Sequence, residues 1–500
     1  MFNPEIICGP PGTGKTTELL RLVEEEFDRG VPPDRVGYLA FTRRAATEAQ
    51  ERAQERFGLQ ANQLPFFRTI HSLCFWALGL NSSDVLQGAR LEEFGDWIGV
   101  KVTGRYVMDE GDTFGFEVGD RCLFMENLSR VRGVTLRQQY DADDDGLHWP
   151  LVERVGRGLK EFKKAQHLYD FTDMLAMFAE SDWRARLEVL FVDESQDLSA
   201  LQWRVVEKLA QGCRRVVVAG DDDQAIYRWA GADVDHFVSM PGNVRVLGQS
   251  WRVPGRVQEL ARETIGRVRA RRPKEWAPRP EAGTLARVQD FDEVALDAPS
   301  VLVLARNACF LRDLEAGLRR EGILYEFRGA SSVRPAVLEA VLAWEALRRG
   351  DAVPVAQALR AYDMMSVGRG VARGHKKLPG FGPDDDVTLS ALKESGGLLR
   401  EDIWHEALDR VPTEERMYLL RALQRGEKLR ARPRVRLSTI HGAKGGEADH
   451  VVLLRDMAWR TFQQMEHMPE DEARVFYVGV TRARERLTVV APQGRRAYDL

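Results

Sequence analysis

Two short segments carry residue types suited to phosphate chemistry. Residues 9–17 read Gly-Pro-Pro-Gly-Thr-Gly-Lys-Thr-Thr, and residues 191–197 read Phe-Val-Asp-Glu-Ser-Gln-Asp. The first segment has the phosphate-binding pattern GxxxxGK[ST] between an apolar strand-like run and a helical pattern. Its glycines let successive backbone N–H groups turn toward phosphate oxygens, and the helix N-terminus adds its positive dipole. The residues expected to surround the phosphates are Gly9, Pro10, Pro11, Gly12, Thr13, Gly14, Lys15, Thr16 and Thr17.

Four side chains in these segments have distinct expected roles. Lys15 provides a point charge for the β- and γ-phosphates, and the Thr16 hydroxyl suits Mg²⁺. Asp193 is expected to hold the same ion, while Glu194 orients or deprotonates a water molecule. A chance glycine-rich turn would lack the strand, the helix and the acidic partner together. The pattern therefore predicts hydrolysis of a nucleoside triphosphate.

A third segment follows another apolar run and contains Gln224, Tyr227 and Trp229. An amide just past a core strand can hold the attacking water or the γ-phosphate. The two aromatic rings, two residues apart beyond a polar loop, are suited to stacking on unpaired bases. The alternative is that they pack in the core, as large aromatic side chains usually do.

Composition narrows the class of protein. The chain has 500 residues, enough for about three or four domains, with 44% hydrophobic and 30% charged residues. It contains no apolar run long enough for a membrane span and no secretion leader, so neither is expected. Five widely separated cysteines without metal-ligand spacing indicate a reduced, cytoplasmic protein.

The net charge of −4 does not point to nucleic acid, but basic residues are concentrated in two runs, 262–274 and 425–436. Either run can line a track for nucleic-acid phosphates. A solvated helix face or linker is an equally good interpretation of each run taken alone.

Strand-like apolar runs alternate with helical patterns, which is typical of parallel sheets built from βαβ units. The runs form two groups that meet near residue 252, and each group is interrupted by a largely helical stretch. Helices are expected over 338–349 and 414–429, and an exposed loop over 366–386. The predicted fold class is therefore α/β, with two parallel-sheet domains that each carry an insertion. The predicted strands are 4–8, 36–41, 188–192, 215–219, 244–247, 301–305, 323–327, 435–440, 450–454 and 487–491.

Taken in order, these motifs resemble the UvrD/Rep/PcrA-like branch of superfamily 1 DNA helicases. One motif alone is weak evidence, but the complete ordered set is specific. The matching segments are 9–17, 39–46, 68–72, 169–173, 191–197, 220–232, 248–252, 303–307, 438–447 and 477–483.

The resemblance implies two RecA-like motor domains, each with a mainly helical inserted subdomain. Motor domain 1A is expected over 1–80 and 166–250, with insertion 1B over 81–165. Motor domain 2A is expected over 251–335 and 430–500, with insertion 2B over 336–429.

The resemblance also implies roles for particular residues. Lys15, Thr16, Asp193, Glu194 and Gln224 match the hydrolytic set, with ATP and Mg²⁺ as the nucleotide and ion. Arg252 and Arg482, the latter expected on the last helix, match paired arginine fingers at the γ-phosphate. Trp251 stands where the family stacks an aromatic ring on adenine, and Glu447 where a carboxylate contacts the ribose. The expected single-stranded DNA contacts are Phe41, Thr69, His71, Tyr227, Trp229, His441 and Lys444.

The function expected from this resemblance is ATP-dependent translocation on single-stranded DNA, in the 3′-to-5′ direction, coupled to duplex unwinding. Expected partners are single-stranded DNA and single-strand/double-strand junctions, with a monomer in isolation and no membrane. One alternative is a translocase that remodels protein–DNA complexes without unwinding. Another is a DNA-binding clamp gated by ATP.

Overall fold

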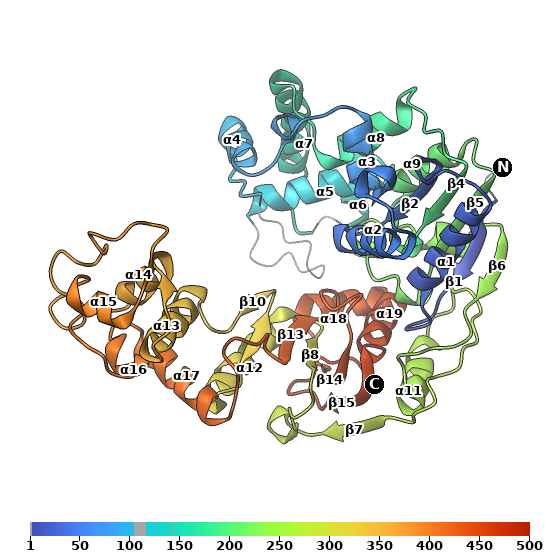
Figure 1. Ribbon diagram of the computed structural model, residues 1–500. Coiled ribbons are helices and arrows are strands. Elements are labelled where there is room, and N and C mark those ends of the chain that lie inside the picture. The colour runs from blue at the N-terminus through green and yellow to red at the C-terminus, as the bar shows by residue number, and fades with distance from the viewer. Residues whose placement is uncertain (1–2, 105–116, 144) are drawn as a thin grey trace. The chain divides into compact units, whose positions relative to one another are not determined.

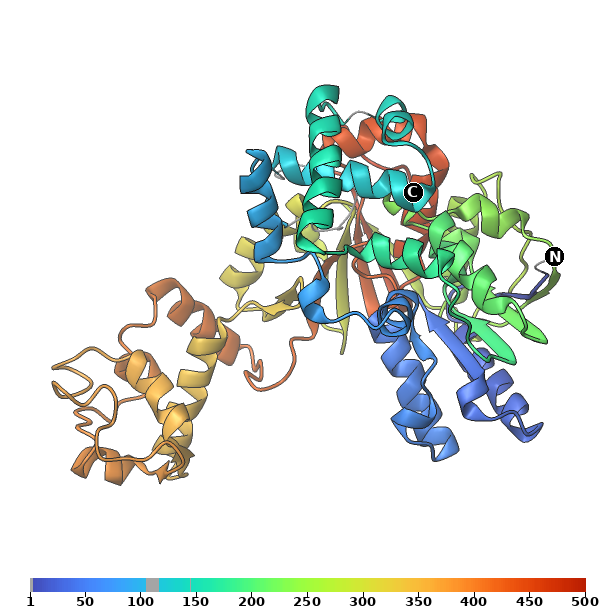
Figure 2. The ribbon, with the colours of Figure 1, turned by 90° about the horizontal axis from the view of Figure 1, so that it is seen from above.

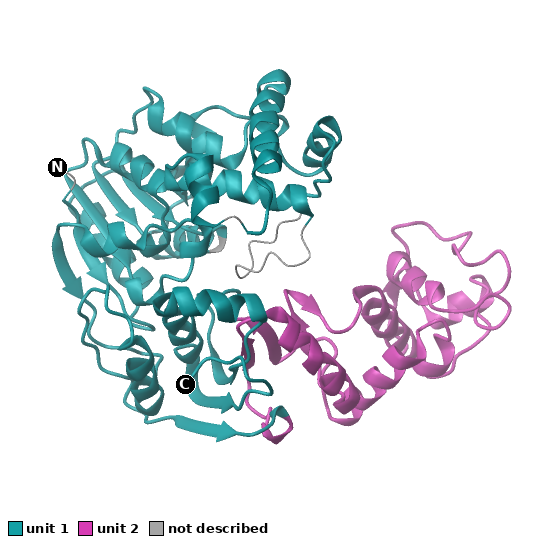
Figure 3. Ribbon diagram, turned by 180° about the vertical axis from the view of Figure 1, so that it is seen from behind, with its two compact units in different colours: residues 1–291, 440–500 teal, residues 292–439 magenta. Residues whose placement is uncertain are grey.

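The computed structural model describes residues 3–104, 117–143 and 145–500. The chain forms two compact units, residues 1–291 with 440–500 and residues 292–439 (Figure 3). The insertion predicted over 81–165 includes residues 105–116 and 144, which lie outside the described residues.

The first unit contains a parallel sheet with the strand order β3-β2-β4-β5-β1-β6 (Figure 1). Crossovers between parallel strands run through helices, so the carboxyl ends of the strands meet at one edge. The strands are β1 (Glu5–Cys8), β2 (Val36–Ala40), β3 (Phe67–Thr69), β4 (Val189–Val192), β5 (Arg215–Gly220) and β6 (Asn243–Val246).

Both faces of this sheet are covered, because successive residues of its strands point to opposite sides. Helices lie on both sides of the sheet (Figure 2). Ile7 and Phe191 pack with one set of helices, whereas Ile6 and Leu190 pack with the other. The first set is α1 (Lys15–Asp28) and α2 (Arg43–Phe57). The second set is α3 (Ile70–Ala77), α8 (Phe171–Glu180), α9 (Ala200–Ala210) and α10 (Val234–Ser239).

A helical segment interrupts the sheet between β3 and β4 and has an apolar core of its own. Phe94, Cys122 and Leu159 lie in that core. Its α7 is amphipathic, with buried residues at Val152, Val155 and Leu159 on one face. The helices are α4 (Ala89–Ile98), α5 (Val118–Arg132), α6 (Leu136–Ala142) and α7 (Trp149–Gln166).

The remainder of the first unit carries three more parallel strands in the order β14-β15-β7. Helix α19 packs against α11 and against β14. These elements are α11 (Gly255–Ile265), β7 (Thr284–Val288), β14 (Ala448–Leu454), α18 (Trp459–His467), α19 (Pro469–Val480) and β15 (Ala483–Val490).

The second unit combines a short sheet with a helical subdomain. Strand β13 pairs in parallel with β8 and β9, and β10 pairs with β9 in the antiparallel sense. Trp344, Tyr362 and Leu419 lie in the core of its helical part. The elements are β8 (Val301–Ala305), α12 (Ala308–Glu321), β9 (Tyr325–Phe327), β10 (Ala330–Ser331), α13 (Pro335–Arg348), β11 (Val353–Pro354), α14 (Val355–Asp363), β12 (Asp386–Val387), α15 (Leu389–Glu394), α16 (Trp404–Ala407), α17 (Thr413–Gln424) and β13 (Val435–Thr439).

The structure confirms the α/β class with parallel sheets. Each segment predicted as a strand overlaps a strand of the structure. Two expectations need correction. Helix α19 ends at Val480, so Arg482 follows the helix instead of lying on it. The loop predicted over 366–386 is not fully exposed, because Val371 and Leu378 are buried in the core of the second unit. Within the described part of the chain, no helix is long and apolar enough to cross a membrane.

Candidate functional site

The phosphate loop joins β1 to α1 through backbone conformations that favour glycine. Gly12 has φ of 72° and Gly14 has φ of 81°, in the left-handed region where a side chain is strained. Gly9 is needed for a different reason, since a Cβ there would lie 1.9 Å from Cγ of Lys15. The backbone amide of Gly9 donates to the carbonyl of Gly220, 3.0 Å away, which fixes the start of the loop beside the end of β5.

Lys15 is the first residue of α1 and its side chain lies back across the loop. Its Nζ donates to the carbonyl of Gly9 at 3.0 Å and lies 3.7 Å from Oε1 of Glu194. The ammonium group is therefore placed between the phosphate loop and the acidic pair that follows β4. This is the position in which a cation can meet an anionic phosphate chain.

Asp193 directly follows β4 and lies beside Thr16 and Tyr38. Thr16 Oγ1 donates to Asp193 Oδ2 at 3.1 Å, and the Tyr38 hydroxyl donates to the same oxygen at 2.9 Å. Burial, together with the charge of Glu194, raises the pKa of Asp193 above its ordinary value. Hydroxyl and carboxylate oxygens at this spacing match the hard oxygen ligands that Mg²⁺ prefers.

The described residues contain no group of three or more His, Cys, Asp or Glu side chains arranged to hold a metal. Thr16 and Asp193 offer two oxygen atoms, and Mg²⁺ commonly combines one or two protein carboxylates with water and substrate phosphates.

Glu194 follows Asp193 with φ of 49°, a left-handed conformation that is uncommon for a residue other than glycine. The turn aims its carboxylate at Lys15, and Gln196 Nε2 donates to Oε2 of Glu194 at 2.6 Å. Burial opposes ionisation, but the positive charges of Lys15 and Lys444 outweigh it and hold the pKa of Glu194 below its ordinary value. An ionised carboxylate at this position can accept a proton from water.

Gln224 and Arg482 meet although they are far apart in sequence. Arg482 Nη2 donates to Gln224 Oε1 at 2.7 Å, and Gln224 Nε2 donates to Asp221 Oδ2 at 2.6 Å. Arg482 is only 1% exposed, and burial beside the charge of Arg252 lowers the pKa of its guanidinium to about 9. Arg482 remains protonated at neutral pH, so a fixed positive charge lies next to the predicted phosphate-sensing amide.

Arg252 and Trp251 lie against the phosphate loop from the other side. The backbone amide of Trp251 donates to the carbonyl of Gly12 at 2.8 Å, whereas its ring is 72% exposed. Arg252 Nε donates to Glu447 Oε2 at 2.5 Å, and Arg484 Nη1 donates to Glu447 Oε1 at 3.1 Å. An exposed ring held at the loop is available for stacking, while Arg252 and Glu447 neutralise each other.

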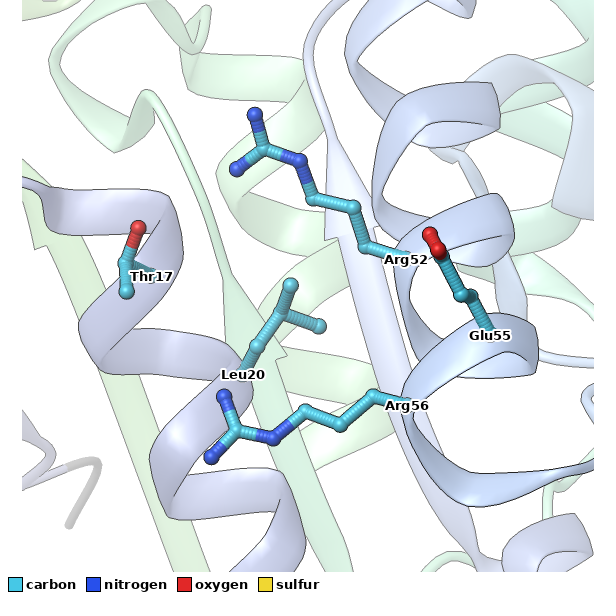
Figure 4. Close-up of a pocket in the computed structure, with 5 residues that line it drawn as sticks. All are labelled: Thr17, Leu20, Arg52, Glu55 and Arg56. Carbon is cyan, nitrogen blue, oxygen red and sulfur yellow. The ribbon is translucent and has the colours of Figure 1, made fainter.

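Thr17 faces away from this site. It lines a pocket of about 260 Å³ between α1 and α2, together with Leu20, Arg52, Glu55 and Arg56 (Figure 4). In this view the side chains of Arg52 and Arg56 extend from α2 toward α1. Thr16 and Thr17 are adjacent in sequence, but their side chains lie in different places. Thr16 bonds to Asp193, whereas Thr17 lines the pocket.

Four of the predicted DNA-contacting rings form a cluster at the edge of the same sheet. Phe41 stacks on Tyr227 with ring centroids 5.7 Å apart, and Trp229 lies 6.4 Å from Tyr227 and 6.1 Å from His441. Lys444 Nζ lies 4.9 Å from the centroid of the Tyr227 ring, in cation–π geometry. The structure therefore brings five of the seven predicted DNA contacts together.

Lys444 also reaches the nucleotide side. Its Nζ bonds to Asp197 Oδ2 and donates to the carbonyl of Gln224 at 2.7 Å. Burial raises the pKa of Asp197 to about 6, although Lys444 acts in the opposite direction. One side chain thus connects the aromatic cluster, the acidic segment and the turn that carries Gln224.

Thr69 and His71 lie apart from this cluster, in a pocket of about 490 Å³ whose lining also includes Arg43, Arg68 and Phe171. Thr69 caps α3 by accepting from the amide of Ser72. Burial and the nearby charge of Arg43 lower the pKa of His71 to about 4, so the imidazole is neutral at physiological pH. The seven predicted contacts therefore fall into two groups.

Sequence reasoning missed several partners of these residues. Tyr38 bonds to Asp193, and Asp197 bonds to Lys444. Asp221 accepts a hydrogen bond from the amide of Gln224. The run of three aspartates at 221–223 beside Gln224 was a usable signal for Asp221. Tyr38 carried no signal, since it is one apolar-looking residue within a strand.

The phosphate loop after β1 and the acidic pair after β4 define a P-loop protein of the α/β class. Residues 2–244 match the model of the UvrD/REP helicase N-terminal domain, and residues 412–494 match that of the UvrD-like helicase C-terminal domain. The chain belongs to the UvrD/Rep/PcrA-like family of superfamily 1 helicases.

Curated relatives agree with this family. The chain is 27% identical over 288 residues to the ATP-dependent DNA helicase PcrA of Staphylococcus aureus, and 25% identical over 290 residues to PcrA of Bacillus subtilis. Each match covers 54% of this chain and 39% of the relative. The chain therefore matches well under half the length of these relatives.

Proposed function

We propose that the protein is an ATP-dependent DNA helicase that translocates on single-stranded DNA and couples ATP hydrolysis to duplex unwinding. The observation that carries the proposal is the position of Glu194, which lies 3.7 Å from Lys15 of the phosphate loop and feels the positive charge of Arg482. The names of the relatives support the DNA and ATP parts of the proposal. The 3′-to-5′ direction rests on family resemblance.

On the nucleotide side, the phosphate loop and Lys15 bind the phosphate chain of ATP, and Trp251 stacks on the base. Thr16 and Asp193 would hold a magnesium ion, which when bound neutralises charge on the phosphate oxygens. Glu194 orients a water molecule and accepts its proton. Arg482 and Arg252 face the γ-phosphate, where positive charge stabilises the transition state.

For Lys15 and Arg252 to bind phosphate, two contacts within the protein have to break. Lys15 bonds to the carbonyl of Gly9, and Arg252 is paired with Glu447. A nucleotide offers phosphate oxygens to both cations and a ribose hydroxyl to Glu447. Binding therefore exchanges contacts within the protein for contacts to ATP, which ties the position of residues 251–252 to nucleotide occupancy.

On the DNA side, the aromatic cluster provides faces for unpaired bases and Lys444 provides positive charge. Because Lys444 touches both Tyr227 and the carbonyl of Gln224, a change at the γ-phosphate reaches the rings through one short segment. We propose that this contact couples hydrolysis to movement along the strand. Thr69 and His71 would contact the strand at the neighbouring pocket.

The four-part division into 1A, 1B, 2A and 2B, at the boundaries given above, is part of the proposal. Separate apolar cores in the helical segments before β4 and after β10 support it. A cytoplasmic location, for which five free cysteines provide support, and a monomeric state in isolation are proposed with it.

Two assays run side by side test the proposed function. Strand displacement on a duplex with a 3′ single-stranded tail, measured beside DNA-stimulated ATP hydrolysis, is expected to give both activities. Hydrolysis without displacement would favour a translocase that remodels protein–DNA complexes. DNA binding that depends on ATP without turnover would favour a clamp.

Replacing Trp229 with alanine is expected to lower affinity for single-stranded DNA by about 1–3 kcal/mol, largely regardless of sequence, because one base loses its stacking partner. The ring is partly exposed and packs beside Phe124, and the enclosed Nε1 has no hydrogen-bond partner among the described residues. Fluorescence anisotropy with a labelled oligonucleotide measures the affinity, and thermal unfolding measures folding. Trp97→Ala, at a ring that is 53% exposed, is the control and should bind normally.

Unchanged DNA affinity combined with a large fall in the melting temperature of Trp229→Ala would make Trp229 a core residue.

Replacing Trp251 with alanine is expected to raise KM for ATP by about 5- to 150-fold, the equivalent of ~1–3 kcal/mol of lost base stacking. The effect on kcat should be small, because stacking on the base is the same in the ground state and the transition state. The ring is exposed, so folding should not change. Steady-state ATP hydrolysis at saturating DNA gives both constants, and Trp251→Tyr should restore most of the affinity. A normal KM in Trp251→Ala would rule out this stacking role.

A further inference from the structure

Three consecutive carboxylates are buried in the turn that carries Gln224. Asp221, Asp222 and Asp223 are each 0% exposed. One cation, Lys274, faces all three, with Nζ at 3.2 Å from Asp221, 2.5 Å from Asp222 and 3.2 Å from Asp223. Its side chain has no exposed surface. Burial alone would lower the pKa of Lys274, but the three carboxylates outweigh burial and raise it.

Lys274 comes from the basic run 262–274, which the sequence left open as a phosphate track or a solvated face. Neither interpretation holds at its C-terminal end. Arg271 is paired with Asp223, and Arg272 donates through Nη2 to the carbonyls of Phe237 and Met240. These cations bond within the protein, so they bind the segment after α11 to the turn at Asp221.

The other cationic residues near the three aspartates bond to Asp222 or Asp223 and not to Asp221. Arg271 bonds to Asp223, the backbone amide of Arg272 donates to Asp222 Oδ2 at 2.8 Å, and Arg474 Nε donates to the carbonyl of Asp222 at 3.0 Å. Among the described residues, Lys274 is the cation that forms an ion pair with Asp221. The charge balance of Asp221 therefore depends on Lys274.

Asp221 in turn determines how the amide of Gln224 is oriented. An ionised carboxylate has only acceptors and a guanidinium has only donors. With Asp221 on one side and Arg482 on the other, a single orientation of the amide satisfies both neighbours. The Nε2 atom of Gln224 faces Asp221 at 2.6 Å and its Oε1 faces Arg482 at 2.7 Å.

We propose that Lys274 is a positioning residue for the hydrolytic reaction, acting through Asp221 to keep the carbonyl of Gln224 turned toward Arg482. The inference rests on the proposed function. Without Lys274, three neighbouring carboxylates would lose the cation that they share, and their repulsion would displace the carboxylate of Asp221 from its place beside Nε2 of Gln224. Without this acceptor the amide of Gln224 is free to turn, so that its NH₂ group would face the N–H groups of Arg482. The segment after α11, which carries Lys274, would in this way control the orientation of the Gln224 amide.

The test is a double-mutant cycle between Lys274 and Gln224. Its readout is the rate of single-turnover ATP hydrolysis. Each rate is divided by the concentration of nucleotide-binding sites, which titration with a fluorescent ATP analogue measures. Lys274→Met is expected to lower the rate about tenfold or more in the parental protein, and less than about twofold when Gln224→Ala is already present. A purely structural role would lower both rates by the same factor. Lys274→Arg keeps the charge and should stay within about threefold of the parent.

Arg271→Met is the matched control. It removes a cation from the same cluster, but Arg271 does not contact Asp221. The factor by which Arg271→Met changes the rate should therefore be the same in the parental protein and in Gln224→Ala. Asp221→Asn provides an independent variant, because it keeps the side-chain volume and removes one of the three buried charges. Asp221→Asn should lower the rate in the parental protein and have much less effect when Gln224→Ala is already present. This result tests the inference even if Lys274→Met fails to fold.

Equal losses in both backgrounds for Lys274→Met or Asp221→Asn, or a normal rate in the parental background, would overturn the inference and leave the proposed function standing. A parental protein that hydrolyses no ATP contradicts the proposed function, and the inference with it.

Discussion

Replacing Glu194 with glutamine is expected to lower ATP turnover by about 10²–10⁴-fold while ATP still binds. The amide has nearly the same shape as the carboxylate but cannot accept a proton from water. The expectation is strong here because Lys15 and Lys444 hold the pKa of Glu194 low, so that the parental side chain is ionised at neutral pH. The side chain also keeps 31% of its surface exposed, which leaves room for the water.

Binding and turnover have to be measured separately to test this expectation. Equilibrium titration with a fluorescent ATP analogue should give an affinity equal to or tighter than that of the parent, because one negative charge near the phosphates is lost. Steady-state hydrolysis with saturating single-stranded DNA gives the turnover. Glu188→Gln, at the other end of β4, is the control and should hydrolyse normally. A turnover close to the parental value in Glu194→Gln would remove Glu194 from the reaction.

The sequence was sufficient for the parallel-sheet fold because its strands are buried on both faces. Leu190 and Phe191 are neighbours that point to opposite sides and are both fully buried, which produces a continuous apolar run. The strands that were missed lack such a run. Strand β3 has only three residues, and β7 includes exposed positions such as Thr284. Short or exposed strands depend on pairing partners that a local pattern does not reveal.

The residues predicted to act in hydrolysis come together because each lies in a short motif at the carboxyl end of a strand. Lys15 and Glu194 belong to different motifs, yet parallel strands bring such ends to one edge. The partners that orient them were not predictable. Lys274 is separated from Asp221 by more than fifty positions of sequence, and nothing in a basic run distinguishes a buried cation from a solvated one. Such long-range side-chain contacts need the three-dimensional structure.

The residues predicted to contact DNA were expected as one set, and the structure divides them into two groups. Residues that follow strand ends, such as Phe41 and Tyr227, come together by the same rule as the hydrolytic residues. Thr69 instead caps α3 and His71 lies within that helix, so the two face a different pocket. A family motif identifies residues without giving their mutual distances.

Arg482→Ala is expected to lower DNA-stimulated ATP turnover by about 10³-fold or more, because an arginine finger stabilises charge that develops in the transition state. Arg482 is suited to this role because it is a buried cation that bonds to Gln224, so its guanidinium is already in place before the reaction. Ground-state binding of ATP should change much less than turnover.

The difficulty in testing Arg482 is that its Nε also donates to the carbonyl of Val478 at 2.9 Å, so alanine removes a structural contact as well. Arg482→Lys separates the two effects. Lysine keeps a buried positive charge but lacks the planar fork, so it should fold like the parent and still lose most of the turnover. Arg495→Ala, an exposed arginine near the C-terminal end of the chain, should hydrolyse normally. Steady-state kinetics with thermal unfolding of each variant provides the comparison. If Arg482→Ala folds and retains a near-parental rate, Arg482 is a structural residue and the positive charge required at the γ-phosphate must come from Arg252 alone.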